Sequence, residues 1–152
     1  MRDSISLPVY YGTPVVWDGW GAVGISQSGQ TTDVIAYLKA AHAAGIPTVA
    51  ITNDAATPLA DAADATVALR AGPEQALAAT KTFTCTLAVL ALLAGALAGR
   101  LEPVAAELAD DARALERHLA GPGTGIVDAA ELLAGHDRVY VIARGTQSRG
   151  SA

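Results

Sequence analysis

The segment from Ala22 to Ile51 constrains the fold of this chain more than any other part of its sequence. A short apolar run, 22–25, stops at a polar loop, after which apolar residues recur with helical spacing as far as Ala44. Gly45 ends this expected helix, and a run rich in β-branched residues follows over 46–51. Strand, loop, helix and strand in this order form a βαβ unit, which places two parallel strands in one sheet.

The rest of the chain continues the alternation of short apolar runs with helical patterns. A long helix from about Glu74 to Gly99 is apolar on nearly all sides, so we expect it to be the most buried element. A following amphipathic helix would turn four residues inward: Val104, Leu108, Leu115 and Leu119. The other expected elements are extended segments with turns over 8–20, a short helix over 59–63, a strand over 65–69, the amphipathic helix itself over about 102–120, a short helix over 126–133 and a last strand over 138–143.

Composition supports a single α/β domain and narrows the range of partners. With 152 residues, 51% of them hydrophobic and 16% charged, the chain has enough apolar material for one globular core. Ten Lys and Arg against 15 Asp and Glu leave no basic surface, so we expect neither nucleic acid nor an anionic membrane as partner. The apolar part of 82–99 is too short to span a bilayer, and the first residues lack a signal-peptide core. A cytoplasmic location is therefore expected.

The loop 26–32, Ser-Gln-Ser-Gly-Gln-Thr-Thr, is the strongest candidate for a binding site. It would follow a strand and open a helix, where free N–H groups and the helix dipole favour an anion such as phosphate. Its hydroxyls can donate to phosphate oxygens, and Gly29 lets the backbone come close. The loop matches neither the Walker A pattern nor the dinucleotide fingerprint. A simpler interpretation has about equal weight: Thr31 or Thr32 caps the helix and the serines form a turn.

Other polar residues have simpler explanations than a role in catalysis or metal binding. Glu74 and Lys81 lie two turns apart on one expected helical face and could both face a cleft. A negative charge at the positive end of the helix dipole explains Glu74 adequately, and a surface position on an apolar helix explains Lys81. Asp61 and Asp64 would solvate a short helix, with a role as an acid/base pair left open. No metal or cofactor is expected, because the remaining candidates have no partners at ligand spacing: His42, His118, His136 and the single cysteine, Cys85.

Four motifs in this order resemble the SIS (sugar isomerase) family of phosphosugar-binding domains: Gly-Ile-Ser-Gln-Ser-Gly-Gln-Thr over 24–31, Val-Ala-Ile-Thr-Asn over 49–53, Ala-Gly-Pro-Glu over 71–74 and Ala-Ala-Thr-Lys-Thr-Phe-Thr over 78–84. The resemblance is greatest to the first SIS domain in the isomerase portion of glutamine–fructose-6-phosphate aminotransferases (glucosamine-6-phosphate synthases) and to glucosamine-6-phosphate deaminase-like proteins. It implies a three-layer, flavodoxin-like α/β fold with a parallel sheet. It also implies a phosphorylated sugar as ligand, a place in amino-sugar metabolism and a homodimer.

The resemblance assigns phosphate contacts to Ser26, Gln27, Ser28 and Thr31, and backbone contacts with the sugar to Leu77 and Ala78. It assigns no catalytic residue, because the family's catalytic groups lie in segments with no counterpart here. By the same resemblance, 1–135 is expected to be an N-terminally truncated SIS domain without the family's first strand, first helix and second strand, and 136–152 the start of a second SIS domain.

The reaction class therefore stays open at the level of the sequence. An isomerising synthase, a deaminase and a deglycase share these motifs. A non-catalytic sugar-phosphate-binding module and an inactive fragment of such an enzyme are the alternatives.

Overall fold

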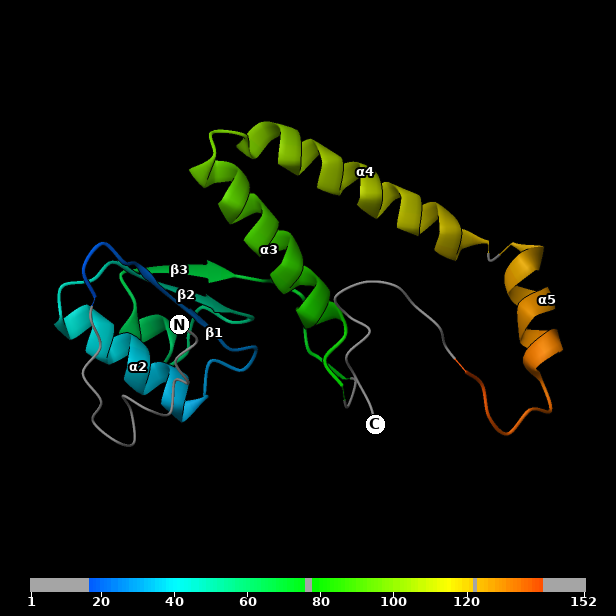
Figure 1. Ribbon diagram of the computed structural model, residues 1–152, viewed down its shortest axis with the longest axis horizontal. Helices are drawn as coiled ribbons and strands as arrows, with labels where there is room; N and C mark the ends of the chain where they lie inside the picture. Colours follow the sequence, from blue (N-terminus) through cyan, green and yellow to red (C-terminus); the bar gives the residue numbers. More distant parts are fainter. Residues whose placement is uncertain (1–16, 76–77, 122, 141–152) are drawn as a thin grey trace. The chain divides into compact units, whose positions relative to one another are not determined.

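The computed structural model describes residues 17–75, 78–121 and 123–140 of the 152-residue chain (Figure 1). The chain divides into two compact units, 1–105 and 106–152, with the boundary inside one helix. The elements are β1 (Ala22–Ile25), α2 (Thr32–Ala43), β2 (Thr48–Thr52), the 3₁₀ turn η1 (Ala60–Ala62), β3 (Ala65–Ala68), α3 (Lys81–Leu97), α4 (Leu101–Ala120) and α5 (Thr124–Leu133).

The three strands form a parallel sheet in the order β1-β2-β3. Ala22 pairs with Thr48 and Ile25 with Ile51, and β3 continues the register with Val49 opposite Ala65. The connection from β1 through α2 to β2 is the βαβ unit that the sequence predicts. The predicted α/β class with a parallel sheet is confirmed.

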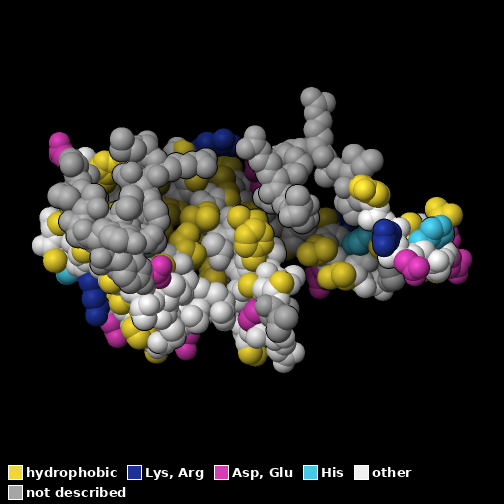
Figure 2. Space-filling model, turned by 60° about the horizontal axis from the view of Figure 1, so that its bottom comes forward, with side chains coloured by type: hydrophobic (Ala, Val, Ile, Leu, Met, Phe, Trp, Pro, Cys, Tyr) yellow, Lys and Arg dark blue, Asp and Glu magenta, His cyan; other side chains and the backbone are white. Residues whose placement is uncertain are grey.

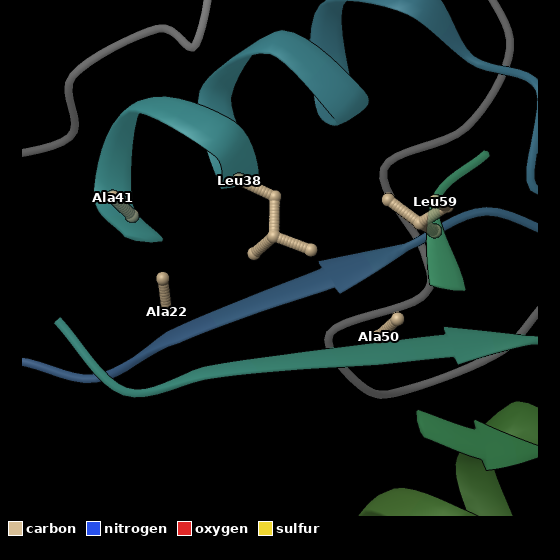
Figure 3. Close-up of a cluster of buried hydrophobic side chains, with 5 residues drawn as sticks. All are labelled: Ala22, Leu38, Ala41, Ala50 and Leu59. Carbon is tan, nitrogen blue, oxygen red and sulfur yellow. The ribbon is translucent and has the colours of Figure 1, made fainter. Parts of the chain in front are cut away.

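Helix α2 packs on one face of the sheet over unusually small residues (Figure 3). Ala22 and Ala50 meet Leu38, Ala41 and Leu59 in the core cluster of the described residues. A Cβ on the intervening Gly24 would lie 3.1 Å from Leu38 Cδ2 and 3.3 Å from Leu59 Cδ1. Small strand residues thus let the helix lie close to the sheet.

Helix α3 differs from the prediction in both its start and its burial. It begins at Lys81, and Glu74 lies before it in the chain. The Glu74 carboxylate accepts hydrogen bonds from Thr80 N and Thr82 N, both at 3.1 Å, and from Thr82 Oγ1 at 2.8 Å. The carboxylate thus supplies an acceptor that the first N–H groups lack inside the helix. Within the helix only Thr82 and Gly95 are buried, so the expectation of the most buried element is wrong.

Helices α3 and α4 meet closely where α4 begins. A Cβ on Gly95 would lie 3.0 Å from Val104 Cγ2, so the glycine makes room for the valine. Of the four residues predicted to face inward, Val104 and Leu108 are half-buried, while Leu115 and Leu119 are exposed by 57% and 71%. Apolar side chains reach the surface elsewhere too, as the yellow areas of Figure 2 show.

The predicted helix over 126–133 is confirmed as α5, which starts two residues earlier. The last predicted strand is not formed over its described part, 138–140, and its remainder lies outside the described residues. Of the extended segments predicted over 8–20, only 17–20 is described, and it forms a turn. None of the helices in the described ranges combines the length and apolarity that crossing a bilayer requires.

Candidate functional site

The loop 26–31 leaves the carboxyl end of β1 and leads into α2, and backbone hydrogen bonds fix it from both sides. The buried Ser26 donates its N–H to the Ile51 carbonyl at 3.1 Å. The Gly29 N–H donates to the Ser26 carbonyl at 3.2 Å, and the Gly29 carbonyl accepts from Leu59 N at 3.1 Å. Gly29 has a φ of 64°, which favours glycine over residues with a side chain.

The loop's hydroxyls bond to each other, and among the described residues only the Val34 N–H at the helix start has a side-chain acceptor, Asp33 Oδ1 at 3.0 Å. Ser26 Oγ and Thr31 Oγ1 are 2.7 Å apart and share a hydrogen bond in which either atom can be the donor. Thr31 is the N-cap residue, yet its side chain makes no capping bond. Ser28 Oγ accepts from Gln30 N at 3.3 Å. Of the simpler interpretation, the turn at the serines forms, but Thr31 makes no capping bond and Thr32 is already the first residue of the helix.

Gln27 joins this loop to the end of β2. Its carbonyl accepts from Asn53 N at 3.1 Å and from Thr52 Oγ1 at 3.4 Å. The side chains of Gln27, Ser28 and Thr31 are exposed at the same edge of the sheet. The structure therefore brings all four residues that the resemblance assigned to phosphate into one open loop.

Asn53 is a residue that motif analysis did not single out. Its Nδ2 donates to the Gly72 carbonyl at 2.8 Å, and its Oδ1 accepts from Ala71 N at 2.9 Å. The side chain thus holds the segment after β3 against the end of β2. Its place at the end of a strand motif was the only available signal, because the partners lie 18 and 19 residues further along the chain.

Glu74 and Lys81, which the sequence predicts on one helical face, have separate positions and roles. Glu74 caps α3, as described above, and does not share a helical face with Lys81. The Lys81 ammonium lies beside Gly72, 4.0 Å from where a Cβ on that glycine would be. Ala78 is exposed three residues before α3, and Leu77, the other residue expected to contact the sugar, lies outside the described residues.

Asp64 lies at the opposite, amino-terminal edge of the sheet and holds strands together. Its Oδ2 accepts from Thr48 N at 2.8 Å and from Thr48 Oγ1 at 2.7 Å, and its Oδ1 is 3.0 Å from His42 Nδ1. The hydrogen bonds from Thr48 and the neighbouring His42 lower the pKa of the Asp64 carboxyl below its usual range. These contacts give Asp64 a structural explanation and leave nothing that favours an acid/base pair with Asp61.

We expect the Asp64 contacts to make stability depend on acidity. Because the pKa is lower in the folded state, the stabilisation is present above the unfolded value of about 3.9 and is lost as the pH falls through the folded value. Asp64→Asn should therefore flatten the fall in melting temperature below about pH 4. Thermal unfolding of both proteins between pH 7 and pH 3 measures this, and parallel curves would contradict it.

The remaining candidates form no metal centre in the part of the chain that the structure describes. His118 and His136 are exposed, and Cys85 is half-buried on α3. Within 17–75, 78–121 and 123–140, no three His, Cys, Asp or Glu side chains are grouped closely enough to hold a metal ion.

A parallel sheet with a hydroxyl-rich loop between strand end and helix start is the arrangement of α/β domains whose ligands lie at the carboxyl edge of the sheet. Residues 14–96 match the SIS domain family, and the chain belongs to this family. The chain is also similar to a crystal structure from Silicibacter pomeroyi DSS-3, provisionally described as a phosphosugar isomerase. The identity is 34% and the TM-score 0.65, over 70% of this chain and 32% of the other.

Curated relatives carry the name isomerizing glutamine–fructose-6-phosphate aminotransferase. The protein from Symbiobacterium thermophilum is 36% identical over 141 residues, which are 88% of this chain and 23% of the relative. The one from Streptococcus pneumoniae is 35% identical over 142 residues, 89% of this chain and 24% of the relative. The chain thus spans about a quarter of the length of these two relatives.

Proposed function

We propose that this chain binds a phosphorylated sugar, with the phosphate held by the loop 26–31. The observation that carries the proposal is the start of α2, where the N-cap residue Thr31 makes no capping bond, beside the bonded hydroxyls of Ser26 and Thr31. The first N–H groups of a helix have no partners inside the helix, and the dipole makes that end positive. The Val34 N–H already donates to Asp33 Oδ1, and an anion bound at this end would satisfy the N–H groups before it without needing a lysine or arginine.

The side chains that would contact the phosphate are Ser26, Gln27, Ser28 and Thr31. The hydroxyls can donate to phosphate oxygens, as can the amide of Gln27. The backbone around Leu77 and Ala78 would contact the sugar. Family membership and the names of the relatives support a sugar phosphate over other anions.

The reaction we propose is that of an isomerase or aminotransferase in amino-sugar metabolism, acting on the fructose-6-phosphate and glucosamine-6-phosphate class of substrates. This chain would supply phosphate binding, and acid/base groups outside it would move the proton between the first two sugar carbons. The division at residue 136 between two SIS domains, the homodimer and the cytoplasmic location stay predictions.

Binding without catalysis is a second candidate function. It is favoured by the engagement of nearby carboxylates in backbone hydrogen bonds: Asp33 Oδ1 accepts from Val34 N at 3.0 Å, and Asp54 Oδ1 accepts from Ala56 N at 2.9 Å. If the chain alone released ammonia and fructose-6-phosphate from glucosamine-6-phosphate, binding without catalysis would be excluded, and the acid/base groups would have to lie within the chain.

Thermal unfolding with fructose-6-phosphate, glucosamine-6-phosphate and inorganic phosphate tests the proposal. A ligand present at about 100 times its dissociation constant stabilises the folded state by about 2.7 kcal/mol, which raises the melting temperature by several degrees. Ser28→Ala and Thr31→Ala each remove a hydroxyl from the loop. We expect each to weaken sugar-phosphate binding about tenfold or more, because hydrogen bonds to charged groups contribute about 1.5–3 kcal/mol.

Thr66→Ala, an exposed threonine on β3, is the matched control and should bind like the unaltered chain. If no phosphorylated sugar raises the melting temperature of the unaltered chain, the proposed function is wrong.

A further inference from the structure

A cavity of about 630 Å³ opens at the carboxyl ends of β2 and β3. Asn53, Asp54, Arg70, Gly72 and Pro73 contribute to its lining. It borders the proposed phosphate loop, because Asn53 lines the cavity and donates its N–H to the Gln27 carbonyl at 3.1 Å. None of the residues assigned to phosphate lines it, so it is a separate part of the same edge.

The backbone of Arg70 is strained. With a φ of 54°, it is the single non-glycine residue with positive φ in the described ranges. Such a conformation persists only where neighbouring contacts enforce it. Here Leu69 N donates to the Thr52 carbonyl at 2.8 Å on one side, while the Asn53 side chain bonds to Ala71 and Gly72 on the other. The end of β2 thus fixes Arg70 from both directions.

Arg70, which forms no ion pair with another described residue, contributes a cation to the cavity, whose lining also includes the Asp54 carboxylate. The exposed Arg70 side chain lines it, and no ion pair or hydrogen bond joins its guanidinium to another residue among those described. The Lys81 ammonium lies near Gly72, one of the residues that line the cavity. Five guanidinium donors without protein acceptors suit a ligand rich in oxygen atoms.

The spacing of the strands relates this cavity to the phosphate loop. Neighbouring strands lie about 4.8 Å apart, so the ends of β1 and β3, two strands apart, are separated by roughly 10 Å. This is comparable with the length of an extended six-carbon sugar phosphate. A ligand whose phosphate lies at the end of β1 can therefore direct its other end toward Arg70.

We propose that Arg70 determines ligand specificity by donating hydrogen bonds to hydroxyl oxygens at the end of the sugar away from the phosphate. The inference depends on the proposed function, since it needs the phosphate in the loop 26–31. Asn53 is the positioning residue, because its side chain maintains the backbone turn that presents the guanidinium.

Titration calorimetry with fructose-6-phosphate and with inorganic phosphate tests the assignment. Arg70→Ala and Arg70→Gly should each raise the dissociation constant for the sugar phosphate about tenfold or more, since both remove charged donors. Neither should change the constant for inorganic phosphate. Arg70→Gly should nevertheless melt at a higher temperature than Arg70→Ala, because glycine relieves the strained φ. Arg117→Ala, an exposed arginine on α4, should match the unaltered chain in every measurement.

The possible outcomes separate this inference from the proposed function. If the unaltered chain binds the sugar phosphate and both Arg70 variants bind it equally well, the inference is wrong and the proposed function stands. Equal weakening of sugar phosphate and inorganic phosphate would place Arg70 on the phosphate and overturn the assignment. If the unaltered chain binds neither ligand, both are wrong.

Discussion

Gly29→Ala is expected to lower the free energy of unfolding by about 2–5 kcal/mol and to abolish binding at the loop 26–31. The φ of 64° costs an alanine about 1–2 kcal/mol. Its Cβ would lie 2.7 Å from Thr57 Cγ2 and still nearer to Thr57 Oγ1 and Cβ, so either the loop or the Thr57 segment must move. Moving the loop breaks the bond from Leu59 N and displaces the hydroxyls.

Gly45→Ala is the matched control for this substitution. Gly45 has a φ of 76°, but nothing lies within 4 Å of where its Cβ would be. Urea unfolding should therefore show a loss of about 1–2 kcal/mol from the backbone alone, with phosphate binding unchanged. Equal losses in the two variants would show that the Thr57 contact has no energetic consequence, contrary to our expectation.

Leu38→Ala is expected to cost about 2–5 kcal/mol, a large part of the stability of a small domain. Leu38 is 1% exposed and lies in the core cluster with Ala22, Ala41, Ala50 and Leu59. Its neighbours on the sheet are Ala22, Ala50 and Gly24, whose side chains are a methyl group or a hydrogen and cannot extend into the space it would leave. The cavity would therefore stay open, which is the condition that makes such substitutions most costly.

Leu87→Ala provides the comparison, because Leu87 lies within α3 and is 52% exposed. Its substitution should cost less than about 1 kcal/mol on the same denaturant curve, since much of the side chain is already in water. A Leu38→Ala protein as stable as Leu87→Ala would mean that the α2 face of the sheet is not the main core of this unit.

The sheet and its first crossover were predictable because local patterns decide them. The alternation between 22–25, the polar loop and the helical spacing up to Ala44 leaves only a parallel arrangement within a βαβ unit. The place of the loop 26–31 follows directly, since a loop between a parallel strand and its helix lies at the carboxyl edge of the sheet.

The start of α3 was not predictable by the same means. Residues 74–80 favour a helix locally, but the Glu74 carboxylate bonds to groups six and eight residues ahead, and this competes with helix formation. Likewise, the Asn53 side chain bonds to residues 18 and 19 positions further along, and no local pattern encodes contacts of that separation. The strained Arg70 between these contacts was missed for the same reason, since nothing in its sequence neighbours requires a positive φ.

The hydrogen bond between Ser26 Oγ and Thr31 Oγ1 determines how many protons the loop can offer outward. Two hydroxyl groups carry two hydrogens, and one of these is used within the pair as long as their bond lasts. Because either oxygen can be the donor, the outward hydrogen can come from the strand side or from the helix side. The pair thus acts as one donor of two possible orientations, able to follow a phosphate oxygen that approaches from either direction.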